Sequence, residues 1–434
     1  MLKRWSLGCL AAVVLAGCAD ESPVGLDPIV PPGVVRSFEI VLDADRFLVM
    51  DTSITGFSTA AGSGYGVVAN AHAGVLNAHT LLRAALPLRS VTYRDTAGVA
   101  KNDTLPIIIG GELILKVDTL QGRTSGPVSL ALYRIAEEWD PRSATWSLRV
   151  DSGDVSLPWS TPGGSRGEFV ARADLSDDTT EVGIPVDSAT LALWSDTLNA
   201  SRGGLIVSET PGSRLRFNGF QLVVHARPSA RPDTVVMDTV QLNGLTFVYD
   251  PVPTYDGAMY VGGTPNWRSY LRLRERLDTL TFEMPCEDGE TCTFRLGDAN
   301  INYAGLVFTP VTPPAGFAPD DTARIFFYRV LGGGTVPLAR APIAPISSDL
   351  MSQLLVPPAS FASGEAAEVG FTRLLRNLLA TMASNQDATP ITLAMLDATS
   401  GTKFGIAAFA PIDAGDAAPR LRLIVSVIDQ DRVR

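Results

Sequence analysis

Three tryptophans close together in the chain are the residues whose possible chemistry is easiest to name. Trp139, Trp146 and Trp159 fall within one polar segment that also contains Glu138 and Arg142. A flat indole face can stack on the apolar face of a sugar ring, while a carboxylate and a guanidinium can hydrogen-bond its hydroxyl groups. Trp139, Trp159, Glu138 and Arg142 are therefore candidate ligand-binding residues. The alternative is that the tryptophans fill a core and pin a long loop, which explains Trp146 better.

Residues for catalysis are sparse. None of the three histidines, His72, His79 and His225, stands beside a serine or cysteine in a nucleophile motif. His72 and His79 fit strand or loop positions better than metal ligation. Adjacent carboxylates occur as solvated loop pairs at Glu137–Glu138, Asp177–Asp178 and Asp320–Asp321. We expect no enzyme activity, no catalytic residue, no metal centre and no cofactor, although a structural Ca²⁺ at an acidic loop stays open without an assignable site.

Four cysteines form two groups by position. Cys9 and Cys18 lie in the N-terminal segment, and Cys286 and Cys292 flank a turn-like Glu-Asp-Gly-Glu sequence. A hairpin there would bring Cys286 and Cys292 together as a disulfide, which contributes about 2 kcal/mol through loop closure. A metal site that includes Asp288 is the weaker alternative, because no nearby histidine or cysteine completes a ligand set.

The N-terminal segment has the features of an export signal. Lys3 and Arg4 precede the apolar run Trp5–Leu15, which is too short to cross a bilayer as a helix. The Leu-Ala-Gly-Cys sequence that ends at Cys18 resembles the lipobox of bacterial lipoproteins. The resemblance implies that residues 1–17 are removed as a signal peptide and that Cys18 carries acyl chains such as palmitate as a lipid anchor.

Charge and the residues after Cys18 narrow the location and the partners. Asp20 comes one place later than the aspartate that retains well-studied lipoproteins at the inner membrane, so the resemblance implies the outer membrane, with the leaflet open. The 434 residues include 35 Lys+Arg and 46 Asp+Glu, a balance that disfavours nucleic acid and anionic lipid as partners. No later stretch reaches the roughly 20 apolar residues of a membrane-spanning helix.

Two proline-rich stretches divide the rest of the chain. Residues 18–35 contain four prolines and little apolar periodicity, which is typical of an extended tether. A second such stretch, with Pro228 and Pro232, separates two halves of similar length. We therefore expect one domain at 36–227 and a second at 228–434.

Short alternating runs of apolar and polar residues dominate both halves. The apolar members of three such runs are Leu113, Leu115 and Val117; Leu271, Leu273 and Leu277; and Leu421, Leu423, Val425 and Val427. These runs predict an all-β fold of two tandem jelly-roll-like antiparallel sandwiches. Helical spacing predicts one short packing helix in each half, over 371–382 and over 188–198, where Asp187 or Ser188 can cap the N-terminus.

The two halves repeat one order of features. Gly74 followed by residues 81–83 matches Gly263 followed by residues 270–272 at the same offset. The Leu-Tyr-Arg-Ile run at 132–135 is likewise echoed by Phe-Tyr-Arg-Val at 327–330. This order predicts a tandem repeat with a degenerate second copy.

The segment 132–146 resembles a known family, the DNRLRE-type module, which is also classed among carbohydrate-binding modules of polysaccharide-degrading bacteria. The likeness rests on the Leu-Tyr-Arg run, on Glu138 with Trp139, and on Thr145 with Trp146. Residues 269–273 and 419–421 resemble the family's arginine strand and closing Pro-Arg-Leu strand, but the second half lacks the tryptophan motif. The resemblance implies jelly-roll sandwiches and glycan binding by the first of them.

These observations predict a non-catalytic, membrane-anchored envelope lipoprotein whose first sandwich binds polysaccharide. The alternative is a structural or assembly lipoprotein that binds a protein partner in the cell envelope and has no glycan ligand.

Overall fold

The computed structural model describes residues 35–55, 64–85, 90–119, 123–152, 154–196, 203–250, 257–285, 291–331, 337–339, 341–384, 391–398 and 403–428. Antiparallel strands make up most of these residues and helices are few, as predicted. The predicted signal peptide, Cys18 and the predicted tether up to residue 34 lie outside the described residues. Within them, no helix is long and apolar enough to cross a membrane.

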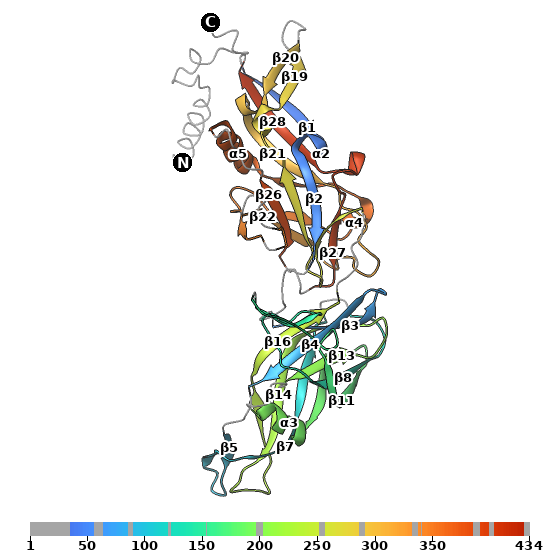
Figure 1. Cartoon of the computed structure of the whole chain (residues 1–434), viewed down its shortest axis with the longest axis vertical. Coiled ribbons are helices and arrows are strands. Elements are labelled where there is room, and N and C mark those ends of the chain that lie inside the picture. Colours follow the sequence, from blue (N-terminus) through green and yellow to red (C-terminus); the bar gives the residue numbers. More distant parts are fainter. Residues whose placement is uncertain are drawn as a thin grey trace, which may run out of the picture.

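Ten strands form one curled sheet in the lower half of Figure 1. The main path is β11-β8-β13-β4-β3-β14-β7-β12, with β15 beside β14 and β16 beside β4. The two end strands, β11 and β12, lie against each other, so the sheet closes round a core. The strands are β3 (Gly66–His72), β4 (Leu76–Ala84), β7 (Ile107–Val117), β8 (Val128–Ile135), β11 (Arg166–Leu175), β12 (Glu181–Asp187), β13 (Gly204–Ser208), β14 (Arg214–Arg227), β15 (Val236–Val240) and β16 (Leu242–Tyr249).

A second set of strands fills the upper half of Figure 1. One sheet has the order β1-β28-β21-β25, another has the order β2-β18-β26-β22-β23 with β24 beside β22, and β17 pairs with β27. The strands are β1 (Val35–Leu42), β2 (Leu48–Ile54), β17 (Met259–Gly262), β18 (Arg268–Leu273), β21 (Asn300–Phe308), β22 (Ala323–Val330), β23 (Ile343–Pro345), β24 (Leu354–Val356), β25 (Ala367–Gly370), β26 (Thr392–Asp397), β27 (Ile406–Phe409) and β28 (Arg420–Ile428).

Three hairpins and several short helical turns complete the fold. The hairpins are β5 (Val91–Arg94) with β6 (Ala100–Asp103), β9 (Leu148–Asp151) with β10 (Ser156–Pro158), and β19 (Thr281–Pro285) with β20 (Thr291–Arg295). The β19–β20 hairpin forms where the cysteine pair predicts one, but Cys286 and the side chain of Cys292 lie outside the described residues. The short helical elements are α2 (Ala44–Phe47), α4 (Ser360–Ser363), η1 (Leu277–Thr279), η2 (Leu296–Asp298) and η3 (Gly415–Ala417).

Both strand sets follow one pairing scheme, which agrees with the repeat seen in the sequence. In the first set β4 pairs with β13 and β16, and in the second β18 pairs with β26 and β2. Likewise β14 lies between β7 and β15, as β28 lies between β21 and β1. The strands β1 and β2 therefore take the places in the second set that β15 and β16 take in the first.

This pairing differs from the domain boundaries expected at 36–227 and 228–434. Strand β1 runs beside β28, with Val35 opposite Ile428, and β2 runs beside β18. Strands β15 and β16 pair with strands that precede them. Residues 35–54 therefore belong with the strands after residue 257, and the first set is an insertion between them. Proline-rich stretches mark where the sequence repeat begins, but hydrogen bonding joins segments that are distant in the chain.

The predicted alternation places apolar side chains inside. Leu113 and Leu115 of β7 are buried in the core of the first set, and Leu421 and Leu423 of β28 are buried in the core of the second. Leu277 differs from the prediction, because it begins the turn η1 and does not continue the strand of Leu271.

Both predicted helices are present. Helix α3 (Ser188–Ser195) begins after Asp187, whose carboxylate accepts a hydrogen bond from the backbone N–H of Thr190 at 2.6 Å. It ends short of the predicted residue 198. Helix α5 (Thr372–Ser384) turns one face into the core of the second set, through Leu375, Leu378, Leu379 and Met382.

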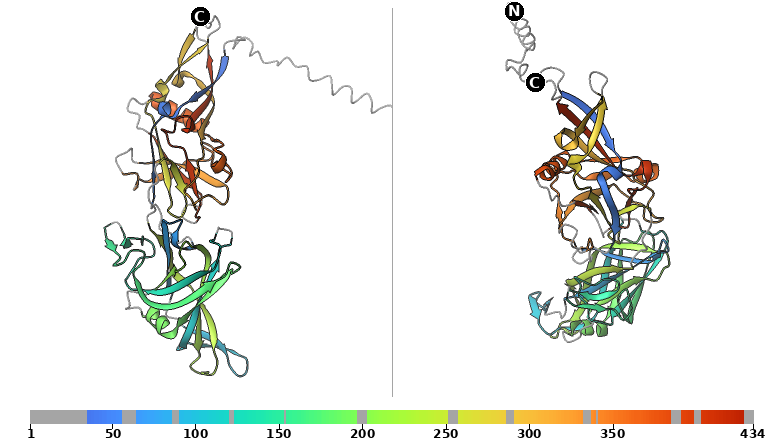
Figure 2. Two further views of the ribbon diagram at one scale, coloured as in Figure 1. Left: turned by 90° about the vertical axis from the view of Figure 1, so that its right-hand side faces the viewer. Right: turned by 45° about the horizontal axis from the view of Figure 1, so that its top comes forward.

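A third apolar cluster joins the two strand sets, which lie end to end in both views of Figure 2. Phe247 and other buried residues of β3, β4 and β16 pack there against Trp267, Phe317 and Phe404. Polar contacts surround the cluster. Tyr249 donates to the carbonyl of Pro265 at 3.0 Å, and the Arg214 guanidinium donates to that of Gly316 at 3.0 Å. The junction is therefore a packed interface.

Candidate functional site

Two tryptophans of the tryptophan segment (residues 136–165), Trp139 and Trp159, are buried, which corrects the prediction of an exposed aromatic surface there. Trp139 and Trp159 are 2% and 5% exposed. They pack with Leu81 of β4 and Leu205 of β13 in a cluster separate from the core inside the sheet. Leu82, the neighbour of Leu81, belongs to that inner core, so the tryptophan cluster covers the outer face of the sheet.

Specific contacts hold this segment on the sheet. The indole N–H of Trp159 donates to the carbonyl of Thr145 at 2.9 Å. The Arg83 guanidinium lies 5.1 Å from the ring centroid of Trp139 and donates to the Trp139 carbonyl at 2.5 Å. Trp146 is half-buried beside His79, with 4.9 Å between the ring centroids. The tryptophans therefore pin a long loop, as the alternative explanation holds.

Glu137 lies at the start of the same loop and holds the end of the loop in place. Its carboxylate accepts hydrogen bonds from the backbone N–H of Ser160, at 2.9 Å, and from the hydroxyls of Ser160 and Ser165. Arg149 lies 3.4 Å away. Burial opposes the charged form, but these hydrogen bonds outweigh it and lower the pKa of Glu137. Glu137 is therefore an ionised structural residue.

The other two candidates, Glu138 and Arg142, are exposed. The backbone carbonyl of Glu138 accepts a hydrogen bond from Arg149 Nη1 at 2.8 Å. Arg142 lines a cleft beside β16. Because Trp139 and Trp159 point into the cluster, the four predicted residues do not form one binding surface.

An exposed aromatic pair lies on the adjoining strands β8 and β11. Phe169 is 50% exposed and stands opposite Tyr133 in the strand register. The two rings meet edge to face, with 5.7 Å between centroids. Tyr133 is half-buried against the tryptophan cluster, which fixes its position. The pair therefore offers an apolar ring surface that a rigid sheet supports.

Charged side chains surround this pair. The Arg166 guanidinium lies 5.5 Å from the ring centroid of Tyr133, and Arg172 forms an ion pair with Glu209. The hydroxyl of Tyr133 donates to Glu209 at 3.4 Å. We call Tyr133, Phe169, Arg166, Arg172 and Glu209 the aromatic face. Its donors and acceptors border an apolar ring, an arrangement that suits a polyhydroxylated ring ligand.

Sequence reasoning missed Phe169 because strict alternation along β11 would place it inside with Ala171 and Ala173. The register of β11 shifts between Phe169 and Ala171, which turns the phenylalanine outward. In the sequence, Tyr133 stands out only as part of the Leu-Tyr-Arg motif.

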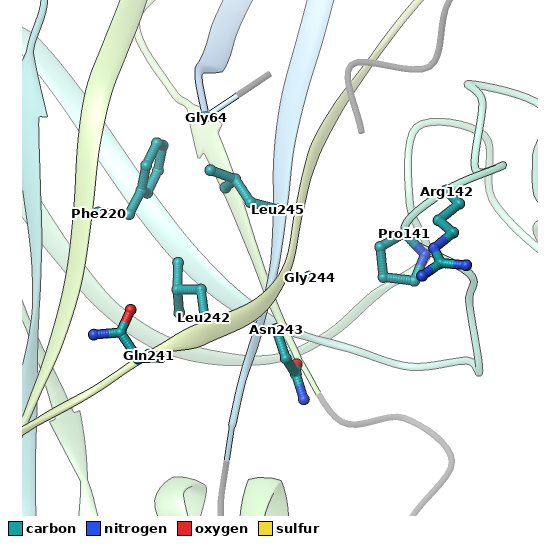
Figure 3. Close-up of a pocket in the computed structure, with 9 residues that line it drawn as sticks. All are labelled: Gly64, Pro141, Arg142, Phe220, Gln241, Leu242, Asn243, Gly244 and Leu245. Carbon is teal, nitrogen blue, oxygen red and sulfur yellow. The ribbon is translucent and has the colours of Figure 1, made fainter. Parts of the chain in front are cut away.

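A cleft of about 480 Å³ opens where the chain passes from β15 to β16. Figure 3 shows Phe220, Leu242 and Leu245 on one side and Pro141 with Arg142 on the other. Gln241, Asn243, Gly64 and Gly244 complete the lining. Strand β15 pairs with β14, whereas β16 pairs with β4. The sheet therefore divides at this point, and the cleft lies at the division.

Local backbone features shape the cleft. The register of β16 shifts between Leu242 and Gly244, which leaves Asn243 as a bulged residue. A Cβ on Gly244 would lie 2.6 Å from Cγ of Pro141, so only glycine lets the loop close against this strand. Because Pro141 follows the buried Trp139 so closely, the tryptophan segment positions one wall of the cleft.

His79 and His72 have packing roles. Burial lowers the pKa of His79 to about 4. The hydrogen bond between Nδ1 and the carbonyl of Gly163, at 2.6 Å, acts in the opposite direction. His72 lies at the junction of the strand sets, with Nε2 3.1 Å from the carbonyl of Gly316, and burial lowers its pKa too. Among the described residues, no group of three His, Cys, Asp or Glu side chains could hold a metal ion.

Comparisons with known proteins leave the family open. No family model and no curated protein matches the chain. A solved structure similar to it is the N-terminal CBM22-1-CBM22-2 tandem domain from Paenibacillus barcinonensis Xyn10C, with 9% identity, 88% of this chain and 97% of that chain covered, and a TM-score of 0.15. Another is the T13 viral particle of IBDV, with 11% identity, 91% and 73% covered, and a TM-score of 0.08. At these values neither a shared fold nor a shared ligand follows, and the DNRLRE resemblance stays a prediction.

Proposed function

We propose that this chain is a non-catalytic, lipid-anchored envelope protein that binds polysaccharide at the aromatic face. The observation that carries the proposal is the exposed ring of Phe169, held edge to face on Tyr133 and bordered by Arg166, Arg172 and Glu209. The ring can cover the apolar face of a pyranose while the charged groups hydrogen-bond its hydroxyls.

The surroundings of Phe169 favour a sugar over a protein as the ligand. The centre of a protein interface is depleted of acidic residues, although arginine is enriched there. Here the Glu209 carboxylate borders the aromatic pair, because it accepts from the Tyr133 hydroxyl and forms an ion pair with Arg172. A ligand with many hydroxyl groups can hydrogen-bond these side chains without desolvating them fully.

The strand order supports presentation of this face away from an anchor. Val35 and Ile428, near the two ends of the described chain, are paired neighbours in the second strand set. The set that carries Phe169 lies at the other end of the molecule (Figure 1). A lipid on Cys18 would therefore hold the second set nearer the membrane and leave the aromatic face farther out.

Polysaccharide binding is tested by retardation of the mature protein in gels that contain neutral or acidic polysaccharides. We expect wild type to be retarded by at least one of them and Phe169→Ala to lose most of the retardation. Phe326→Ala is the matched control, because Phe326 of β22 is 40% exposed but lies in the other strand set. Equal retardation of wild type and Phe169→Ala would show that the aromatic face is not the site.

The anchor is tested separately by Cys18→Ser. We expect wild type to fractionate with outer membranes and to incorporate labelled palmitate, and the variant to do neither. A variant that stays in the membrane fraction would refute lipid anchoring at Cys18.

A protein partner is the second candidate, and an exposed apolar tip favours it. Leu105 and Met237 are 77% and 72% exposed, and Ile107 and Val235 are exposed beside them. These side chains lie at the start of β7 and in or next to β15. Ile107 and Met237 lie on the two strands that flank β14, and exposed apolar side chains gathered on neighbouring strands are typical of protein contacts. Cross-linking in cells would yield a partner of wild type that Leu105→Asp with Met237→Asp loses, whereas unchanged cross-links would exclude the tip.

A further inference from the structure

The cleft beside β16 has the composition of a small-ligand site distinct from the aromatic face. We propose that it binds the acetamido group of an N-acetylated amino sugar. This specificity goes beyond general polysaccharide binding and stands on different residues. Its volume of about 480 Å³ lies within the range of sites that hold small molecules.

The apolar part of the lining fits a methyl group. Phe220, Leu242 and Leu245 are each half-buried and line the same side of the cleft (Figure 3). A methyl group placed among them removes apolar surface from water. A hydroxyl group in the same place would lose its hydrogen bonds to water without replacement by these side chains. The lining therefore discriminates between an acetamido substituent and a hydroxyl.

The polar part of the lining fits an amide. Gln241 and Asn243 are exposed at the cleft. Each side-chain amide carries an N–H donor and a carbonyl acceptor, which complement the carbonyl and N–H of an acetamido group. Neither amide has a side-chain hydrogen bond to another of the described residues, so both are available to a ligand.

The backbone that holds these groups is built for a fixed shape. Because Asn243 is bulged, its side chain points in a different direction from that of a residue in a regular strand. Pro141 closes on Gly244 from the opposite wall, and the buried Trp139 fixes the segment from which Pro141 comes. A site on strands and a pinned loop keeps its geometry before the ligand arrives, which raises affinity.

Calorimetric titration of the full mature chain with N,N′-diacetylchitobiose and with cellobiose tests this proposal, because the two disaccharides differ in their acetamido groups. We expect wild type to bind the acetylated sugar about tenfold more tightly or better, and Gln241→Ala with Asn243→Ala to lose about tenfold in that affinity. Gln221→Ala is the matched control, since this exposed amide of β14 does not line the cleft. Thermal unfolding establishes that the variants are folded.

The outcomes separate this site from the aromatic face. Retained binding of the acetylated disaccharide by Phe169→Ala, with loss in the double amide variant, supports the cleft whatever the aromatic face does. Equal affinity for the two disaccharides overturns the proposal. So does binding that the double amide variant keeps and Phe169→Ala loses, which would assign the sugar to the aromatic face alone.

Discussion

Removal of the indole of Trp139 tests whether the tryptophan segment is structural. The side chain is 2% exposed and packs with Leu81 and Leu205 on the outer face of the sheet. Truncation of a buried tryptophan to alanine costs about 3–5 kcal/mol in the free energy of unfolding, through lost burial and the cavity that remains. Loss of the contact between the indole and the Arg83 guanidinium lowers the free energy of unfolding further.

A second substitution of Trp139 separates the loss of the ring from the loss of its N–H group. The indole N–H of Trp139 is buried and has no hydrogen-bond partner among the described residues. Trp139→Phe therefore removes no hydrogen bond and keeps an aromatic ring in the cluster, so we expect a loss of only about 1–2 kcal/mol. The expected order of the free energy of unfolding, wild type above Trp139→Phe above Trp139→Ala, is typical of a packed ring.

Urea unfolding measures these differences, and limited proteolysis of residues 136–165 shows whether the loop loosens. We expect the alanine variant to unfold at lower urea and to be cleaved faster in this loop. An alanine variant with unchanged stability and weaker polysaccharide binding would refute the reasoning, because it would show that Trp139 contacts ligand.

Two further predictions concern buried charges and titration. The pKa of His79 is about 4 in the folded chain, mainly through burial, against 6.5 in the unfolded chain, so the unfolded state binds a proton first as the pH falls. The free energy of unfolding should therefore drop by about 3 kcal/mol between pH 6.5 and pH 4, and His79→Gln should abolish this part of the slope; an identical slope in the variant would contradict the assignment. Asp118 accepts from the buried Arg216 Nε at 2.7 Å, so Asp118→Ala should cost about 3–5 kcal/mol. The exposed Asp349, 3.7 Å from Arg373, is the control, and Asp349→Ala should leave the urea midpoint unchanged. Equal midpoints for both variants would refute the burial argument.

Local sequence rules predicted the elements well because those elements depend on neighbouring residues. Asp187 caps α3 as expected, and the alternation of Leu113 and Leu115 identifies β7 and its inward face. These features follow from side-chain hydrogen bonding and from the two-residue period of a strand.

Long-range pairing and irregular backbone escaped the same rules. Nothing in β1 marks β28 as its partner, because any strand edge of suitable pattern can offer the same hydrogen bonds. Trp139 and Trp159 have polar neighbours that indicate exposure, but their loop folds back over the outer face of a sheet. Phe169 escaped because a register shift reverses its side. The candidate site thus differs from the predicted one at the positions where backbone irregularity or tertiary packing decides orientation.

Hydroxyl-radical footprinting of the mature protein with its best-retarded polysaccharide tests the location of glycan binding most directly. Phe169, Phe326 and Met237 are all exposed in the free chain, so each one reports on its own surface. We expect polysaccharide to protect Phe169 and Tyr133 and to leave Phe326 and Met237 as reactive as before. Protection of Met237 or Phe326 with an unchanged Phe169 would contradict it.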